Sequence, residues 1–196
     1  INEISSAITL LTFNWVILTL EGNLGVASYG IIANLALIGI AIFNGVAQGI
    51  QPLISKGYGQ RNVYLLKKVL KTALITSLVI AAIMYIIIFA YSDGIIRIFN
   101  SEGSIEIARM SKIGLRIYFI GFFLAGINII IAMYLSATES AKDAFLISIA
   151  RGCIIIVPMV LLLSKVWDMT GIWMAFVLTE AIVVIFSIYR QRRIIY

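Results

Sequence analysis

The sequence predicts an all-α integral membrane protein, folded as a bundle of six transmembrane helices. Hydrophobic residues make up 62% of the 196 positions and charged residues only 12%, and the mean hydropathy of +1.07 lies outside ordinary globular usage. Six apolar runs approach or exceed the roughly 20 residues that a spanning helix needs. The runs lack the alternation of a membrane β-strand, so a barrel is not expected.

Three of the six runs carry features that refine the prediction. The first is short and has Glu3 at its edge, and since the chain opens on Ile1 we expect a longer protein from which it comes. Pro52 is expected to end or bend the second helix, and Pro158 to kink the fifth. The expected spans are residues 4–20, 24–54, 72–91, 117–137, 144–164 and 169–189.

The distribution of charge predicts the orientation of the helices. If both ends of this segment lie in the cytoplasm, the cytoplasmic regions hold nine basic and two acidic residues, and the external loops hold five of each. Cytoplasmic loops of membrane proteins carry such an excess of Lys and Arg, so we expect both termini inside. The basic residues sit between apolar runs rather than on one solvated face, and nucleic acid is therefore not an expected partner.

The longest external connection is expected over residues 92–116. It could contain a short amphipathic helix over 104–112, which Ser104 would cap and in which Ile105 and Ala108 share a face. The alternative is a solvated connector that lies on the membrane surface.

Two ionisable residues fall inside predicted spans. Arg151 lies about 12 Å deep from the cytoplasmic side and Glu180 about 15 Å deep from the same side, at 1.5 Å per helical residue. An isolated charge at such depth is costly, so we expect the two to pair. The pair could be a coupling-ion or substrate site, or a structural ion pair between packed helices.

Several chemistries have no residues to support them. The chain has no histidine and one cysteine, Cys153, so disulfides within the chain, cysteine-histidine zinc sites and histidine relays are excluded. It also has no phosphate-binding loop and no paired-carboxylate or Ser-Lys arrangement. We expect neither an enzyme nor a bound cofactor.

A polar stripe ends the second span. Asn44, Gln48 and Gln51 recur at helical spacing, and amides are costly in hydrocarbon unless that face meets protein or water. Gly45 and Gly49 add a GxxxG spacing, which indicates close helix packing.

Four segments of the chain resemble the MATE family, the multidrug and toxic compound extrusion transporters. The run from Gly45 to Asn62, with A-Q-G-x-Q-P and then G-Y-G, resembles the end of the eighth helix of that family, and VASYGII from Val26 resembles its start. IIIVPMVLL from Ile154 and GIWMAFVLTE from Gly171 resemble the eleventh and twelfth helices. The resemblance covers nearly the whole chain as the C-terminal six-helix lobe of a two-bundle, twelve-helix transporter.

The resemblance implies export of small cationic, amphipathic compounds through the plasma membrane in exchange for sodium ions or protons. Some family members use a glutamate in the seventh helix and an aspartate in the tenth for coupling. Glu3 falls close to that glutamate, but residues 117–137 contain no acid. Glu3 is therefore the candidate coupling residue that the resemblance indicates, and Glu180 is the candidate from the pair with Arg151. The implied partners are the substrate, the lipid bilayer, and the absent N-terminal lobe or a second copy.

Chemistry and analogy together indicate the substrate contacts. Aromatic faces and polar groups in an apolar cavity hold organic cations. The candidates are Asn14, Asn34, Asn44, Gln48, Gln51, Asn128 and Tyr134, with Glu3 as the anion. Each could instead make an interhelical hydrogen bond.

Two other functions stay open. One is flippase-type export of a lipid-linked glycan or another amphiphile, which would favour a more cationic central cavity. The other is a non-transporting membrane subunit that needs a partner half.

Overall fold

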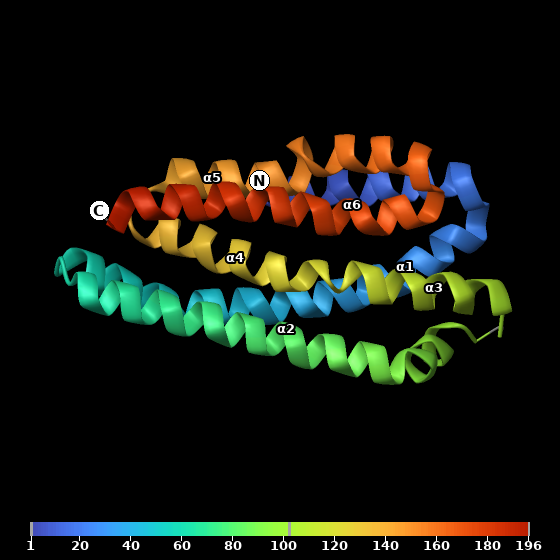
Figure 1. Ribbon diagram of the computed structural model, residues 1–196, viewed down its shortest axis with the longest axis horizontal. Coiled ribbons are helices and arrows are strands. Elements are labelled where there is room, and N and C mark those ends of the chain that lie inside the picture. Colours follow the sequence, from blue (N-terminus) through green and yellow to red (C-terminus); the bar gives the residue numbers. More distant parts are fainter. Residues whose placement is uncertain (1, 102, 196) are drawn as a thin grey trace.

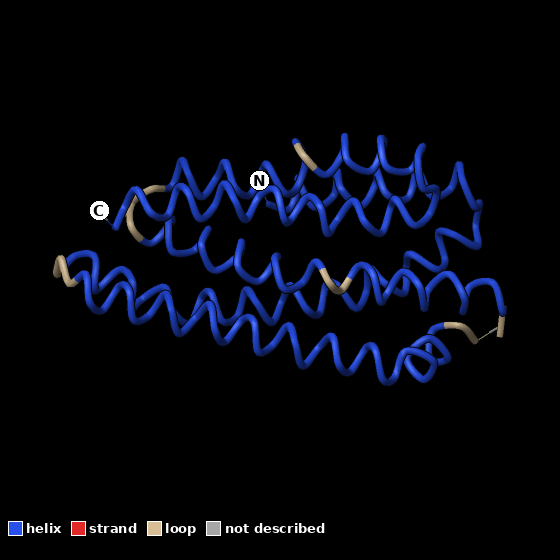
Figure 2. The backbone as a smooth tube through the Cα atoms, viewed as in Figure 1, coloured by secondary structure: helices blue, strands red, loops and turns tan. Residues whose placement is uncertain are grey.

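The chain folds into long helices that lie side by side (Figure 1). The computed structural model describes residues 2–101 and 103–195, with side chains over 7–101 and 103–191. Short connections lie mainly at the two ends of the bundle (Figure 2). The elements are α1 (Asn2–Gly59), α2 (Val63–Phe99), α3 (Ile105–Tyr118), α4 (Gly121–Ala137), α5 (Ala141–Ile149), the π-helix η1 (Ala150–Ile154) and α6 (Ile156–Ile195).

Three helical stretches are long and apolar enough to cross a membrane, or four if the bent pair α3 and α4 counts as one span. Two of them, Ala7–Gly59 and Ala141–Gln191, contain 53 and 51 residues, more than twice the length that a bilayer requires. Each reverses direction once (Figure 1). The described residues therefore form six antiparallel arms, and the predicted all-α six-helix class is confirmed.

The first reversal depends on a glycine. Gly22 has φ 60° and ψ −149°, a conformation that a residue with a Cβ reaches only under strain. The second reversal lies at Trp167 and Asp168, where Asp168 has φ 49° and ψ −132°. The two arms of α6 then approach so closely that the Leu163 carbonyl occupies the place of a Cβ on Gly171.

The helices extend well beyond the expected spans. α2 continues to Phe99 through a break at Tyr91, and α3 starts at Ile105, so the predicted long connection over 92–116 is wrong. Charged residues at the end of a span stop the apolar run but do not stop the helix. The connector alternative is wrong for the same reason, because residues 105–118 are helical and bury one face.

Ser104 does cap α3, as predicted, and its Oγ accepts a hydrogen bond from the backbone N–H of Ile107 at 3.4 Å. The helix is longer than expected, and a bend of 46° joins it to α4. Near the end of α2, Lys112 Nζ lies 2.8 Å from Asp93 Oδ1, and the Arg116 guanidinium lies over the Phe89 ring. These contacts fasten α3 to the extension of α2.

The helix continues past one of the two prolines and is disturbed just before the other. Pro52 does not end its helix, since α1 continues to Gly59. Before Pro158 the chain forms a π-turn, in which the N–H of Ile155 donates to the Ala150 carbonyl, five residues back. Proline has no N–H for the carbonyl four residues before it, so the helix widens upstream of the ring.

The core of the bundle is aromatic at its centre. Tyr118 and Phe176 stack with ring centroids 4.1 Å apart, and Phe119 and Phe122 stack at 4.3 Å. Trp173 is fully buried beside them. Leucine and isoleucine side chains face outward around the bundle, as they would toward lipid. The aromatic centre sets the spacing of the arms and so the shape of the site.

Candidate functional site

The π-turn places a charged residue inside the bundle. Arg151 lies within η1, and this turn leaves the Gly152 carbonyl available to a neighbouring helix. Thr9 Oγ1 donates to that carbonyl at 2.5 Å, from the first arm of α1. π-turns often occur at functional sites because they re-aim a side chain. Here Pro158, the widened turn and Thr9 together direct Arg151 toward α6.

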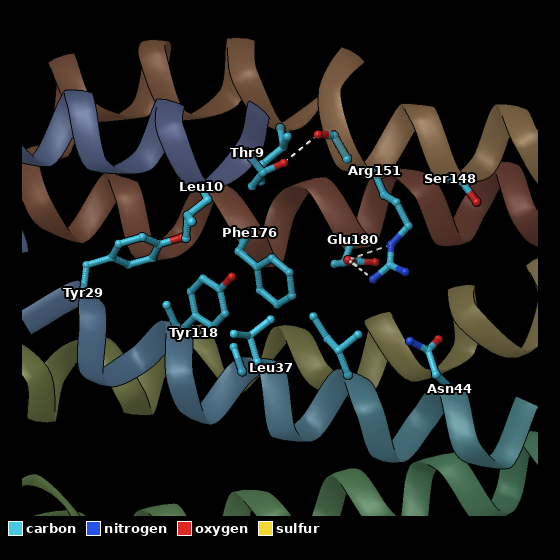
Figure 3. A pocket seen from close by; sticks show the side chains of 15 residues that line it. Thr9, Leu10, Tyr29, Leu37, Asn44, Tyr118, Ser148, Arg151, Phe176 and Glu180 are labelled. Atoms are coloured by element: carbon cyan, nitrogen blue, oxygen red, sulfur yellow. Dashed lines mark hydrogen bonds and ion pairs between the residues drawn. The ribbon is translucent and has the colours of Figure 1, made fainter. Parts of the chain in front are cut away.

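Arg151 and Glu180 contact each other, as their predicted depths indicate (Figure 3). Arg151 Nη2 lies 2.6 Å and Nε 3.1 Å from the same oxygen, Glu180 Oε1. The Glu180 side chain is only 2% exposed, and that of Arg151 is 18% exposed. Burying a carboxylate is costly unless such charge-assisted donors satisfy its oxygens.

A second set of hydrogen bonds holds the other carboxylate oxygen. Asn128 Nδ2 donates to Glu180 Oε2 at 2.7 Å and to the Glu180 backbone carbonyl at 3.1 Å. Ser187 Oγ in turn donates to Asn128 Oδ1 at 2.9 Å. Glu180 is thus enclosed by nitrogen donors from α4 and η1, and its carboxylate is locked in one orientation.

A cavity of about 230 Å³ lies beside this pair. Arg151 and Glu180 are the only charged groups among the described residues that line it. The rings of Tyr29, Tyr118 and Phe176 form its aromatic part (Figure 3). The remaining described lining residues are Thr9, Leu10, Ala33, Ala36, Leu37, Ile40, Asn44, Ser148, Gly152 and Ile156. The arrangement suits an aromatic or amphipathic guest.

The predicted substrate residues are spread over the bundle. Of the seven, Asn44 alone belongs to the described lining of the cavity. Gln48 and Gln51 are exposed on the same helix, and Asn34 donates to the Gly30 carbonyl of its own helix. Asn14 is half-buried on the first arm of α1.

Asn128 and Tyr134 are fully buried rather than exposed to the cavity. Asn128 holds Glu180, as described above, and the Tyr134 hydroxyl has no hydrogen-bond partner among the described residues. The side chain of Glu3 lies outside the described residues. The predicted residues with described side chains therefore do not form one site: Asn44 lines the cavity, Asn128 belongs to the buried network, and the other five lie elsewhere.

Sequence reasoning missed the aromatic part of the cavity. Tyr29, Tyr118 and Phe176 come from three different arms, and each sits in an apolar run where an aromatic residue is an ordinary core residue. Nothing in the sequence marks Thr9 or Ser148 as lining a cavity either. The presence of Pro158 near Arg151 was the one available indication, since a proline disturbs the turn before it.

Charge pairs also lie at both ends of the bundle. Arg190 Nη1 is 2.9 Å from Asp143 Oδ1, which links the last turns of α6 to the start of α5. At the opposite end, the hydrogen bond from Lys112 holds the pKa of Asp93 below its ordinary value. Within the described residues no group of three His, Cys, Asp or Glu side chains could hold a metal ion.

Comparison with known proteins identifies relatives of this chain. It is 27% identical over 161 residues to the multidrug export protein MepA of Staphylococcus saprophyticus, an alignment of 82% of this chain and 35% of MepA. MepA of Staphylococcus haemolyticus is 26% identical over 174 residues, which are 87% of this chain and 38% of that protein. The chain spans little more than a third of these relatives.

Solved structures share the fold. An inward-facing multidrug resistance MATE family transporter of the MOP superfamily matches 99% of this chain with a TM-score of 0.93 at 19% identity. The chain covers 45% of that transporter. An outward-facing structure of a multidrug resistance MATE family transporter gives a TM-score of 0.92 over 44% of its length. The bundle thus corresponds to one lobe of such a transporter.

The family model agrees with the fold. It covers residues 1–162, which include α1 to α5, the π-turn and the first turns of α6. This chain belongs to the MatE family, and its fold is one six-helix lobe of an integral membrane transporter.

Proposed function

We propose that this chain is one half of an exporter of small cationic, amphipathic compounds. The observation that carries the proposal is the cavity between the helices, where aromatic rings lie beside polar groups. The faces of Tyr29, Tyr118 and Phe176 can hold the flat apolar part of a drug-like molecule or a cationic group. The names of the relatives support export of many drugs rather than one metabolite.

The uncovered polar face supports a second half. Asn44, Gln48 and Gln51 are exposed along α1, and a Cβ on Gly45 or Gly49 would meet open space. Amides facing lipid would be costly, whereas amides facing a second lobe or a water-filled passage would not. The second half is an N-terminal lobe or another copy of this chain. Transport would then occur between the two halves.

The proposed orientation has both ends of this segment in the cytoplasm of a plasma-membrane protein. The turn between α1 and α2 supports it, because basic residues dominate both sides of that turn. Those residues are Lys56, Arg61, Lys67, Lys68 and Lys71.

Export is proposed to be coupled to sodium ions or protons. Glu180 is the candidate on the described part of this lobe, because its carboxylate lies beside the cavity. Coupling at this position requires Arg151 to release the carboxylate, since both oxygens accept hydrogen bonds in the present arrangement. Glu3 remains a candidate from the sequence.

Accumulation of ethidium in cells tests the proposal. Cells that produce the full-length gene product should accumulate less ethidium than control cells, and Phe176→Ala should reduce that difference. Ionophores that collapse the sodium gradient or the proton gradient separately would identify the coupling ion. Equal accumulation with and without the protein, when immunoblots show it in the membrane, would contradict export of cations.

A further inference from the structure

Among the described residues that line the cavity, the charged group more accessible to a guest is the Arg151 guanidinium and not the Glu180 carboxylate. Glu180 is 2% exposed, and both of its oxygens accept hydrogen bonds from Arg151 and Asn128. A cation entering the cavity would therefore meet a carboxylate that is almost inaccessible and already hydrogen-bonded at both oxygens. Among the described lining residues there is no second acid.

Arg151 keeps one side of its guanidinium available. Nε and Nη2 donate to Glu180, whereas Nη1 donates to no group in the described part of the chain. The side chain is 18% exposed and lines the cavity. A donor without a partner in an apolar cavity is unfavourable, and an acceptor on a guest would satisfy it.

The groups around Arg151 indicate which kind of guest could accept a hydrogen bond from its guanidinium. The Tyr118 and Phe176 rings line the same cavity, so an aromatic group can lie against them while its substituent reaches the guanidinium. A carboxylate forms the strongest hydrogen bond with that donor. The ion pair itself is neutral, so a guest with only negative charge would leave a net charge in the cavity, whereas a zwitterion would not.

The volume of the cavity limits what enters. At about 230 Å³ it is smaller than the roughly 300–1,000 Å³ of sites that enclose a drug-sized ligand. It fits one end of such a molecule. The cationic end would then extend toward the exposed amides of α1.

We propose that Arg151 is a specificity-determining residue that binds the aromatic carboxylate end of zwitterionic amphipathic substrates. This inference rests on the proposed function, and it adds to that function a preference, among cationic amphiphiles, for those that also carry a carboxylate. The aromatic end lies against Tyr118 and Phe176, and the carboxylate accepts a hydrogen bond from Arg151 Nη1.

Rhodamine 110 and its methyl ester, rhodamine 123, test the proposal, because they differ only at the carboxylate. Fluorescence anisotropy on the purified full-length protein gives a dissociation constant for each dye. The ratio of the two constants is compared between variants, so that partitioning of the dyes into detergent cancels. Arg151→Lys keeps a positive charge beside Glu180 but loses the forked donor. Arg151→Gln with Glu180→Gln removes both charges together and leaves neither unpaired.

We expect the ratio of dissociation constants in the wild type to favour rhodamine 110 about tenfold more than the ratio in either variant. A change of this size corresponds to the loss of one charge-assisted hydrogen bond. Arg109→Gln, on the exposed surface of α3, should keep the wild-type ratio. An equal ratio in the wild type and the double variant would overturn the proposal, as would failure of rhodamine 110 to bind. Export of rhodamine 123 from cells is measured separately, so loss of the proposed function and loss of carboxylate selectivity are distinguishable.

Discussion

Arg151 and Glu180 meet in the middle of the bundle although 29 residues and a chain reversal separate them. Arg151 Nη2 lies 2.6 Å from Glu180 Oε1, and the carboxylate is further held by Asn128. The contact joins η1 to the second arm of α6 across the cavity wall. It therefore couples the packing of the lobe to the site where a guest would bind.

Removing one member of this pair should destabilise the protein more than exchanging both. Glu180→Ala leaves Arg151 without its partner and should cost about 3 kcal/mol of unfolding free energy. The exchange Arg151→Glu with Glu180→Arg should recover a substantial part of the loss. Asn128 can adapt by turning its amide, because Ser187 can then accept a hydrogen bond instead of donating one.

Thermal unfolding of the detergent-solubilised protein measures both effects. The matched control is Lys112→Glu with Asp93→Lys at the exposed pair, where the single and double changes should all be small because solvent screens the charges. A double exchange at Arg151 and Glu180 that is no more stable than Glu180→Ala would show that the contact is not a pairwise interaction.

The arms and this ion pair could be predicted because hydropathy and helical rise determine them. A residue ten positions from a span end lies at a calculable depth, and two charges at one depth have few alternatives to pairing. The overall length of α2 and α3 could not be predicted in this way. Hydropathy marks where the bilayer ends, and Ser92 to Phe99 stay helical beyond it.

The cavity was harder to predict than the fold. An amide in an apolar helix indicates a polar contact but not its partner, so Asn34, Asn44 and Asn128 looked equivalent. In the structure the first bonds its own helix, the second lines the cavity and the third holds Glu180. The difference depends on which arms are neighbours, which no single-segment pattern contains.

Gly22 should not tolerate a side chain. Its φ of 60° and ψ of −149° are unfavourable for any residue with a Cβ, so Gly22→Ala should lower the unfolding free energy by about 1–3 kcal/mol. Gly30→Ala is the control, because Gly30 is helical and a Cβ there meets nothing within 4 Å. It should be neutral or stabilising by up to about 1 kcal/mol. Equal unfolding temperatures of the two variants would show that the reversal does not need this conformation.

The Asp93–Lys112 pair should stabilise the folded protein by an amount that depends on pH. The Lys112 hydrogen bond lowers the pKa of Asp93 below 3.8, so the stabilisation is present above that pH and is lost as the pH falls through the lowered value. Unfolding temperatures of the wild type and Asp93→Asn should therefore differ slightly at neutral pH and converge in acid. Added salt should reduce the difference, because Asp93 is exposed. A gap that persists in acid would mean that the Asp93 charge is not its source.

The contribution of the Thr9 hydrogen bond to the stability of the π-turn can be measured by comparing substitutions at Thr9 and at the neighbouring Thr12. Thr9→Val keeps the shape of the side chain but leaves the Gly152 carbonyl without this donor, and should cost about 1 kcal/mol of unfolding free energy. Thr12→Val loses only a bond to the Ile8 carbonyl of its own helix, which the backbone already uses, and should have little effect. Hydrogen exchange over residues 150–156 should rise in Thr9→Val and not in Thr12→Val, because opening of the π-turn exposes its amides. Equal exchange in both variants would mean that Pro158 alone maintains the turn, and Arg151 would then be aimed by its own helix without help from α1.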